Sequence, residues 1–103
     1  MLIVNNDNFK SEVLESNSLV VVDFYADWCG PCQMLKPLLE EISEERSDVK
    51  IVKVNVDNAR ELAIEFGIFS IPTVLFFKEG NLVDKFVGYI GKEAINELID
   101  KNL

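Results

Sequence analysis

Residues 19 to 32 are the most informative segment for the fold, and their sequence is Leu19-Val20-Val21-Val22-Asp23-Phe24-Tyr25-Ala26-Asp27-Trp28-Cys29-Gly30-Pro31-Cys32. Its first seven residues are a nearly continuous apolar and β-branched run, which is typical of a strand covered on both faces. Gly30 and Pro31 then interrupt the chain, and a helical pattern begins at about Cys32. A buried strand followed at once by a helix predicts an α/β fold built on a partly parallel sheet.

The rest of the chain continues this alternation of strands and helices. Besides residues 19–25, we expect strands at residues 2–4, 49–55, 73–78 and 82–87. We expect helices from an N-cap at Asn6 or Asp7 to about Ser16, from about Cys32 to Arg46, from an N-cap at Asn58 to Gly67, and from about Lys92 onward. The order βαβαβαββα predicts one domain over residues 1–103, with a central mixed β-sheet flanked by helices.

The same pattern predicts which side of each longer helix is buried. Helical spacing places one apolar face on Met34, Leu35, Leu38, Leu39 and Ile42, and another on Ala94, Ile95, Leu98 and Ile99. Pro37 falls inside the first of these helices and should bend it. Glu79-Gly80-Asn81 should join the last two strands as a short hairpin connection.

The composition excludes several classes of function. The 103 residues include 18 acidic and 10 basic side chains, a net charge of −8, so we expect neither nucleic acid nor a membrane surface as a partner. No apolar run approaches the roughly 20 residues that cross a bilayer, and the N-terminus lacks a signal-peptide pattern, which favours a cytoplasmic location. The chain has no histidine, which excludes Ser-His and Cys-His couples and imidazole metal ligands.

Both cysteines lie in one short segment, Trp28-Cys29-Gly30-Pro31-Cys32. At the start of a helix, residues i and i+3 share a face about 5–6 Å apart, which is the Cα separation that a disulfide needs. The pair can therefore cycle between dithiol and disulfide with little backbone motion. Cys29 would lie at the helix N-terminus, where free amides and the helix dipole favour a thiolate, whereas Cys32 would lie one turn in and be covered.

Three other interpretations of the two cysteines compete with a redox role. Two spare core cysteines would be scattered, and chance alone rarely leaves the only two of them three residues apart. A structural disulfide that closes so short a loop constrains the unfolded chain little. A zinc site needs four ligands, so two thiolates without histidine would require a dimer. Redox chemistry is the favoured interpretation of the motif.

The segment from Val22 to Cys32 closely resembles the active-site segment of the thioredoxin family, and the resemblance covers essentially all 103 residues. Cys-x-x-Cys alone is a moderate signal, but Trp-Cys-Gly-Pro-Cys followed by Ile71-Pro72-Thr73 is far more specific. Further matches are Met34, Pro37, residues 53–57, Gly67-Ile68, residues 76–80 and Val87-Gly88. The resemblance implies the thioredoxin fold.

The resemblance also implies an activity, that of a general protein-disulfide reductant working by dithiol–disulfide exchange. Cys29 would be the nucleophile and Cys32 the resolving cysteine. The implied partners are disulfide-containing proteins and a thioredoxin reductase that re-reduces the pair; no bound cofactor or metal is implied, and a monomer is expected. Gly30-Pro31 between the cysteines resembles the reducing branch of the fold, because isomerases and oxidases usually carry His there.

Asp23 interrupts an otherwise apolar strand, and a buried carboxylate is costly unless it is partnered or protonated. One interpretation, strengthened by the resemblance, is a buried acid/base with a raised pKa that takes the Cys32 proton, directly or through water. The other is a buried ion pair with Lys53 on the neighbouring strand. The two are compatible, since Lys53 would tune Asp23.

The resemblance implies a substrate-binding groove around the cysteines. Trp28, Gly30 and Pro31 would contribute from the active-site segment, and Ile71 and Pro72 from the loop before a strand. For Trp28, which we expect to be half exposed, a place in the core is the alternative. Pro72 should be cis and pack against the cysteine pair, which would leave the Ile71 backbone free to bind an extended peptide as an added strand. Gly88 would keep the groove shallow, although a plain turn at the strand end is the alternative.

Some positions depart from the usual family pattern. Tyr25 stands where many members carry Trp, Gln33 replaces a frequent Lys or Arg after the second cysteine, and Phe69-Ser70 and Tyr89 lie at variable positions, so the choice of protein partners is not carried over. Two other functions stay open on the sequence alone. The pair could be poised for oxidation or isomerisation, or the fold could serve as a binding or chaperone-like module without turnover.

Overall fold

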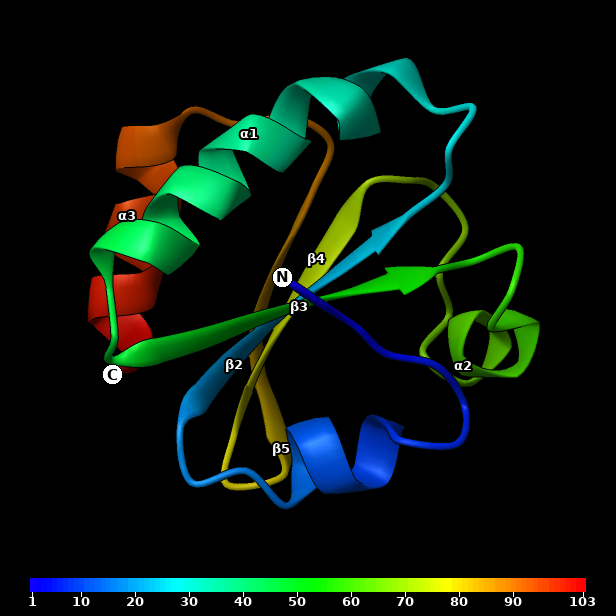
Figure 1. Cartoon of the computed structure of the whole chain (residues 1–103), viewed down its shortest axis with the longest axis horizontal. Helices are drawn as coiled ribbons and strands as arrows, with labels where there is room; N and C mark the ends of the chain where they lie inside the picture. The colour runs from blue at the N-terminus through cyan, green and yellow to red at the C-terminus, as the bar shows by residue number, and fades with distance from the viewer.

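The computed structural model describes all 103 residues as a five-stranded sheet with helices on both sides (Figure 1). The strand order is β1-β3-β2-β4-β5, so β2 lies in the middle of the sheet. β1, β3 and β2 run parallel, while β4 is antiparallel to β2 and β5 is antiparallel to β4. The strands are β1 (Leu2–Ile3), β2 (Leu19–Tyr25), β3 (Val49–Asn55), β4 (Thr73–Lys78) and β5 (Asn81–Val87). This is the mixed α/β sheet predicted from the sequence.

Four helical segments cover the two faces of the sheet. They are η1 (Lys10–Leu14), a short π-helix, and the α-helices α1 (Gly30–Glu45), α2 (Arg60–Glu65) and α3 (Lys92–Asn102). In Figure 1, α1 and α3 lie together on one face, and η1 and α2 lie on the other. No helix combines the length and the apolarity needed to cross a membrane.

Alternate residues of β2 point into two separate hydrophobic cores, which is why the sequence of this strand is almost continuously apolar. Val21 joins the core under α1 and α3, together with Leu35, Leu39, Ile95 and Ile99. Val20, Val22 and Phe24 point the other way into the core under η1 and α2, which also holds Phe9 and Phe77. The central strand is therefore anchored from both sides, and its carboxyl end is held in place.

The first helix differs from its prediction, because it begins at Lys10 and neither Asn6 nor Asp7 caps it. The Asn5 and Asn8 side chains hold a turn instead. Asn8 Oδ1 accepts a hydrogen bond from the backbone N–H of Asn5 at 2.8 Å, and Asn5 Oδ1 accepts one from Asp7 at 2.9 Å. Asn side chains compete with helix in this way, so the segment before Lys10 forms a turn.

Asn58 was also predicted to cap a helix, and this prediction is wrong. α2 begins at Arg60, with Ala59 as its N-cap residue and no side-chain cap. The backbone carbonyl of Asn55 accepts from the N–H groups of both Asn58 and Ala59, and Asn55 Oδ1 accepts from Asp57 at 2.9 Å. One asparagine at the end of β3 thus holds residues 57–59 in a turn, and the helix begins only after it.

Met34 and Ala94 were assigned to buried helix faces, but both are exposed. Each stands one residue before the centre of its buried face, Leu35 in α1 and Ile95 in α3. One residue is about 100° of rotation around an α-helix, which carries the side chain out of the interface. Pro37 lies inside α1, as expected.

The hairpin between β4 and β5 is tighter than the predicted three-residue connection. Asn81 already pairs with Lys78, so Glu79 and Gly80 alone form the turn. Both have positive φ, 51° and 79°, which fits a type I′ turn. A Cβ on Gly80 would lie only 3.0 Å from the Leu14 carbonyl oxygen, so the turn packs closely against the end of η1.

Candidate active site

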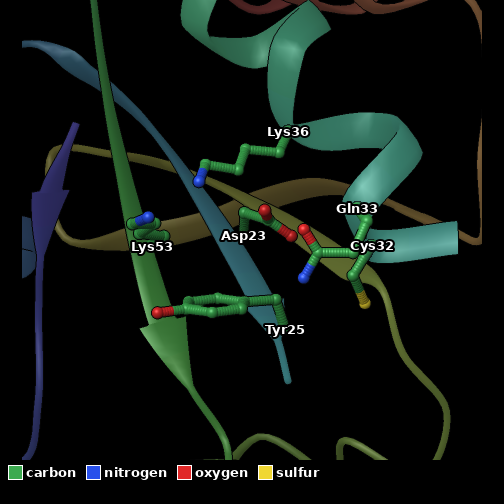
Figure 2. A pocket seen from close by; sticks show the side chains of 6 residues that line it. All are labelled: Asp23, Tyr25, Cys32, Gln33, Lys36 and Lys53. Atoms are coloured by element: carbon green, nitrogen blue, oxygen red, sulfur yellow. The ribbon is translucent and has the colours of Figure 1, made fainter. Parts of the chain in front are cut away.

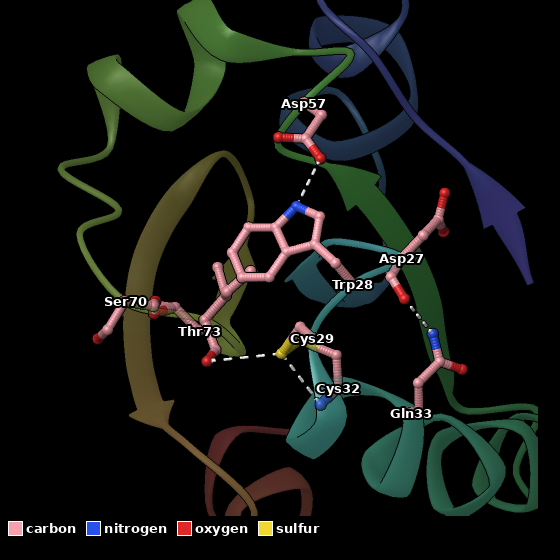
Figure 3. The surroundings of a disulfide bond; sticks show 9 residues. Asp27, Trp28, Cys29, Cys32, Gln33, Asp57, Ser70 and Thr73 are labelled. Atoms are coloured by element: carbon pink, nitrogen blue, oxygen red, sulfur yellow. Dashed lines mark hydrogen bonds between the residues drawn. A yellow bond between two sulfur atoms is a disulfide. The ribbon is translucent and has the colours of Figure 1, made fainter.

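Cys29 and Cys32 lie at the start of α1, close to the carboxyl end of β2, and are joined by a disulfide with a Cα–Cα distance of 5.2 Å (Figure 3). Cys29 is the N-cap residue of α1, and its sulfur accepts a hydrogen bond from the Cys32 backbone N–H at 3.2 Å. Both cysteines are buried. The Cys29 sulfur therefore occupies the position where a helix N-terminus best stabilises negative charge.

The residues between the cysteines explain why the helix starts here. Gly30 and Pro31 are the first two residues of α1, where the missing N–H of proline leaves no helical hydrogen bond unmade. The Cys29 backbone N–H closes the preceding turn on the Ala26 carbonyl at 3.2 Å. Gly30 is exposed, and a Cβ on it would have no neighbour within 4 Å, so the surface is open at this position between the two buried cysteines.

The loop before β4 faces the disulfide from the opposite side. Its Ile71–Pro72 peptide bond is cis, and the Ile71 carbonyl oxygen lies 3.8 Å from the Cys29 sulfur. Gly88, at the end of β5, donates its backbone N–H to the Pro72 carbonyl at 2.8 Å. Its φ of +85° belongs to the left-handed region that favours glycine. Ile71, Pro72 and Gly88 thus form one wall beside the cysteines.

Trp28 precedes the pair and is 72% exposed, so it belongs to the surface and not to the core. Its indole Nε1–H donates to Asp57 Oδ2 at 2.9 Å (Figure 3). Asp57 was not predicted as a site residue, although the sequence held a signal for it. Tyr25 and Asn55 end neighbouring parallel strands in register, so residues shortly after each must emerge at the same edge of the sheet.

Asp23 is buried beneath the cysteines and has one carboxylate oxygen, Oδ1, without a hydrogen-bond partner. Burial raises the pKa of Asp23 to about 7, and the positive charge of Lys53 acts in the opposite direction. Asp23 lines a cavity of about 40 Å³ together with Tyr25, Cys32, Gln33, Lys36 and Lys53 (Figure 2). Asp23 and Cys32 therefore line the same small cavity.

The structure does not form the buried ion pair considered for Asp23 and Lys53. The two residues are partners in the β2–β3 register, but no salt bridge joins them. The Lys53 ammonium instead lies 5.3 Å from the centre of the Tyr25 ring, within range of a cation–π interaction. Tyr25 thus offers the lysine an alternative to the carboxylate, and Lys53 acts on Asp23 only from a distance.

Two further residues of α1 border the site. Gln33 donates from Nε2 to the Asp27 carbonyl at 3.2 Å, which ties the helix to the segment before Trp28. Lys36 lines the Asp23 cavity and was not singled out from the sequence, because one exposed lysine in a charged helix gives no signal. No cluster of three or more Cys, Asp or Glu side chains is arranged to hold a metal ion.

Comparison with known proteins agrees with this geometry. The family model described as "Thioredoxin" matches residues 1–101. The chain belongs to the thioredoxin family. It is 46% identical over 96 residues to the thioredoxin of Mycoplasmoides gallisepticum, covering 93% of this chain and 96% of the relative. It is 48% identical over 101 residues to thioredoxin 1 of Synechococcus elongatus, covering 97% and 94%, and 46% identical over 99 residues to that of Bacillus subtilis, covering 95% and 93%.

Membership of the thioredoxin family indicates the activity of the cysteine pair. This thioredoxin-family protein has a redox-active disulfide, Cys29–Cys32, and is a disulfide reductant, that is, a protein-disulfide oxidoreductase. The predicted site residues fall into three groups around that disulfide. Cys32, Asp23 and Lys53 line the cavity below it, Ile71, Pro72 and Gly88 form the wall beside it, and Trp28, Gly30 and Pro31 surround it in the active-site segment.

Proposed function

We propose that the reduced protein acts on disulfides of other proteins through two thiol–disulfide exchanges. The Cys29 thiolate attacks one sulfur of the substrate disulfide, the substrate S–S bond breaks, and a mixed disulfide forms while the first substrate sulfur leaves as a thiolate. The Cys32 thiolate then attacks the Cys29 sulfur and releases the second substrate thiolate. The substrate gains two electrons, and the Cys29–Cys32 disulfide is formed. The observation that carries this proposal is the position of Cys29 as the N-cap of α1.

The two cysteines take different roles because their surroundings differ. The Cys29 sulfur accepts a hydrogen bond from the Cys32 backbone N–H and lies beside the open surface at Gly30. Both features support the assignment of Cys29 as the nucleophile. Cys32 lines the Asp23 cavity below the surface, out of reach of a large substrate. Cys32 is therefore the resolving cysteine, since its target, the Cys29 sulfur, is held within the same helical turn.

Asp23 is the base that receives the Cys32 proton. Its pKa of about 7 matches a group that exchanges protons near neutral pH. The cavity that Asp23 and Cys32 share is about 40 Å³, and roughly 10–15 Å³ is enough for one water, so the proton can pass through water. Lys53 tunes this base, because its positive charge favours the ionised carboxylate.

The substrate polypeptide binds in the groove formed by Trp28, Gly30, Pro31, Ile71, Pro72 and Gly88. The Ile71 backbone N–H makes no backbone hydrogen bond within the chain, so it is available to an extended peptide. Such a peptide would add to the loop as a short strand. The Ile71 carbonyl, close to the Cys29 sulfur, would then bring the substrate cysteine next to the nucleophile.

Turnover needs a partner that restores the dithiol, and by family membership this partner is a thioredoxin reductase. We propose that the chain works in the cytoplasm as a monomer and as one domain over residues 1–103, without a bound cofactor. The two hydrophobic cores lie on opposite faces of one sheet, which supports the single domain. The net charge of −8 supports protein partners over nucleic acid or membrane.

The reduction potential of the Cys29–Cys32 pair tests the proposal. The protein is equilibrated in graded dithiol/disulfide buffers, and free thiols are counted by alkylation. A potential at or below the cytosolic glutathione poise, roughly −220 to −260 mV by extraction methods, supports a reductant. A much higher potential would indicate an oxidant or isomerase, and the absence of any two-electron transition would indicate a binding module.

A further inference from the structure

We propose that a groove between β5 and the loop that follows α2 is a second docking site for the substrate protein. It would hold an apolar side chain of an extended substrate segment, with an acidic residue next to that side chain. This inference rests on the disulfide reductase function proposed above and adds a binding site outside the reactive pair. The groove, here called the β5 groove, has a volume of about 210 Å³.

The β5 groove is mainly apolar and open. Six of its ten lining residues are hydrophobic, and they are Phe66, Ile68, Phe69, Leu75, Leu82 and Val87. Phe69 is 99% exposed, and Leu82 and Val87 are each about half exposed. β5 is the edge strand of the sheet, and the other side of the groove is formed by residues 66–70, which follow the short helix α2. Contiguous exposed apolar residues of this kind mark interaction sites.

The groove is continuous with the segment that contacts the reactive disulfide, and this identifies its occupant. Ser70 and Thr73 line the groove and flank Ile71–Pro72, whose Ile71 carbonyl lies against the Cys29 sulfur (Figure 3). Val87 lines it from β5, one residue before Gly88, which is hydrogen bonded to Pro72. A polypeptide bound along Ile71 therefore enters the β5 groove on leaving the disulfide.

The groove carries a positive charge, so we expect the substrate to have an acidic residue next to the apolar side chain that binds there. Lys85 is the one charged residue that lines it, in a chain whose net charge is −8. The adjacent Asp84 does not neutralise Lys85, because its carboxylate binds Asn102 and Lys101 of α3 on the other face of the sheet. An exposed ion pair is weak, so the apolar side chain supplies most of the binding and Lys85 sets the preference.

The test uses a series of synthetic peptides, each with one cysteine in disulfide linkage to a chromophoric thiol. Serine fills the other positions, and a Leu-Asp pair is moved stepwise away from the cysteine. The rate constant for reduction by the dithiol protein is divided by that for a small disulfide without a peptide. We expect one Leu-Asp position to raise this ratio about tenfold, the gain for burying part of a leucine side chain.

Two substitutions and one control assign the effect to the β5 groove. Phe69→Ser should abolish the tenfold gain, and Lys85→Glu should shift the preference from Leu-Asp to Leu-Lys peptides. Ile64→Ser is the matched control, because Ile64 in α2 is also an exposed apolar residue but does not line the groove. Its ratio should equal that of the unchanged protein.

The outcomes separate this proposal from the reductase function. If the small disulfide is not reduced at all, the proposed function fails. If it is reduced but no Leu-Asp position raises the ratio, or if Phe69→Ser keeps the gain, the docking site is wrong. If Phe69→Ser changes only the oligomeric state in sedimentation equilibrium, the groove joins copies of the chain, which also overturns the proposal.

Discussion

Asp23 and Lys53 stand opposite each other in the register of β2 and β3, yet the lysine lies over the Tyr25 ring and leaves the carboxylate unpaired. A contact ion pair would hold Asp23 ionised and unable to accept a proton near neutral pH. The distant lysine lowers the proton affinity only in part, so burial still raises the pKa to about 7. The separation of these two charges is what makes Asp23 suitable as a base.

The buried Asp23 should make the stability of the protein fall as the pH rises. Its folded-state pKa of about 7 lies above the ordinary value of 3.8. Between about pH 4 and pH 7 the folded state therefore binds more protons than the unfolded state, and the free energy of unfolding decreases through this window, by roughly 4 kcal/mol in total. Asp23→Asn should remove this dependence and be more stable than the unchanged protein at pH 8. Urea unfolding at several pH values measures this.

Glu44→Gln is the control for that experiment. Glu44 lies on the solvated side of α1 and has no ion-pair partner. This variant should keep the pH dependence of the unchanged protein. An equal loss of the dependence in both variants would show that it does not come from Asp23.

Lys53→Met should move the titration of Asp23 to higher pH. The substitution keeps an unbranched side chain over the Tyr25 ring and removes the charge that favours the carboxylate. We expect the pKa of Asp23 to rise by roughly one unit, measured by the carbon-13 carboxyl resonance as the pH is changed. Lys50→Met, on the same strand but bonded to Glu12 on the other face, should leave that resonance unmoved. An unchanged midpoint in Lys53→Met contradicts the assigned role.

The central part of the fold could be predicted because its signals are local. The strands at residues 19–25, 49–55 and 73–78 were predicted with the bounds that the structure has, since their β-branched runs are buried on both faces. The caps predicted at Asn6, Asp7 and Asn58 are wrong because the turns before η1 and α2 are held by hydrogen bonds to other asparagines, Asn5, Asn8 and Asn55. Which of several neighbouring asparagines does so depends on the turn, and the residue type alone does not show it.

The candidate site was predictable where chemistry is carried by residue type and spacing. The two cysteines and Asp23 stood out for this reason. The position of Lys53 over Tyr25 could not be predicted, because a register pair of opposite charges favours contact, and the choice is made by side-chain geometry. The β5 groove could not be predicted from the sequence for a similar reason. It is assembled from three separated segments, and its Phe69 had appeared only as a variable position.

The indole of Trp28 should respond to loss of Asp57. Asp57→Ala removes the acceptor of the Nε1–H hydrogen bond, whereas Asp57→Asn keeps an oxygen in place. Trp28 is the only tryptophan, so its indole N–H gives a single proton resonance that reports the bond directly. We expect a clear upfield shift in Asp57→Ala, a smaller one in Asp57→Asn and none in Asp27→Ala. A resonance that stays in place in Asp57→Ala would show that the bond is absent in solution.

Substituting each cysteine should separate the two chemical roles. Cys32→Ser keeps the nucleophile but removes the resolving thiol, so its mixed disulfide with a protein substrate should accumulate and be visible by mass spectrometry. Cys29→Ser should form little mixed disulfide, because the remaining cysteine, Cys32, is buried one turn inside α1. Equal trapping by the two variants would contradict the assignment of Cys29 as the attacking residue.

Gly88 and Gly30 provide a matched pair for testing backbone strain in the wall beside the disulfide. A Cβ at either position would meet no atom within 4 Å, so neither substitution by alanine causes a clash. Only Gly88 has a positive φ, +85°, and this conformation costs an alanine roughly 1–2 kcal/mol. Gly88→Ala should therefore lower the free energy of unfolding by about that amount in urea, without a change in the denaturant slope.

Gly30→Ala is the control. Gly30 is the first residue of α1, where alanine fits the helix, so this variant should be as stable as the unchanged protein or slightly more stable. Equal stabilities for the two variants would mean that Gly88 can leave the left-handed region without disturbing the Pro72 hydrogen bond.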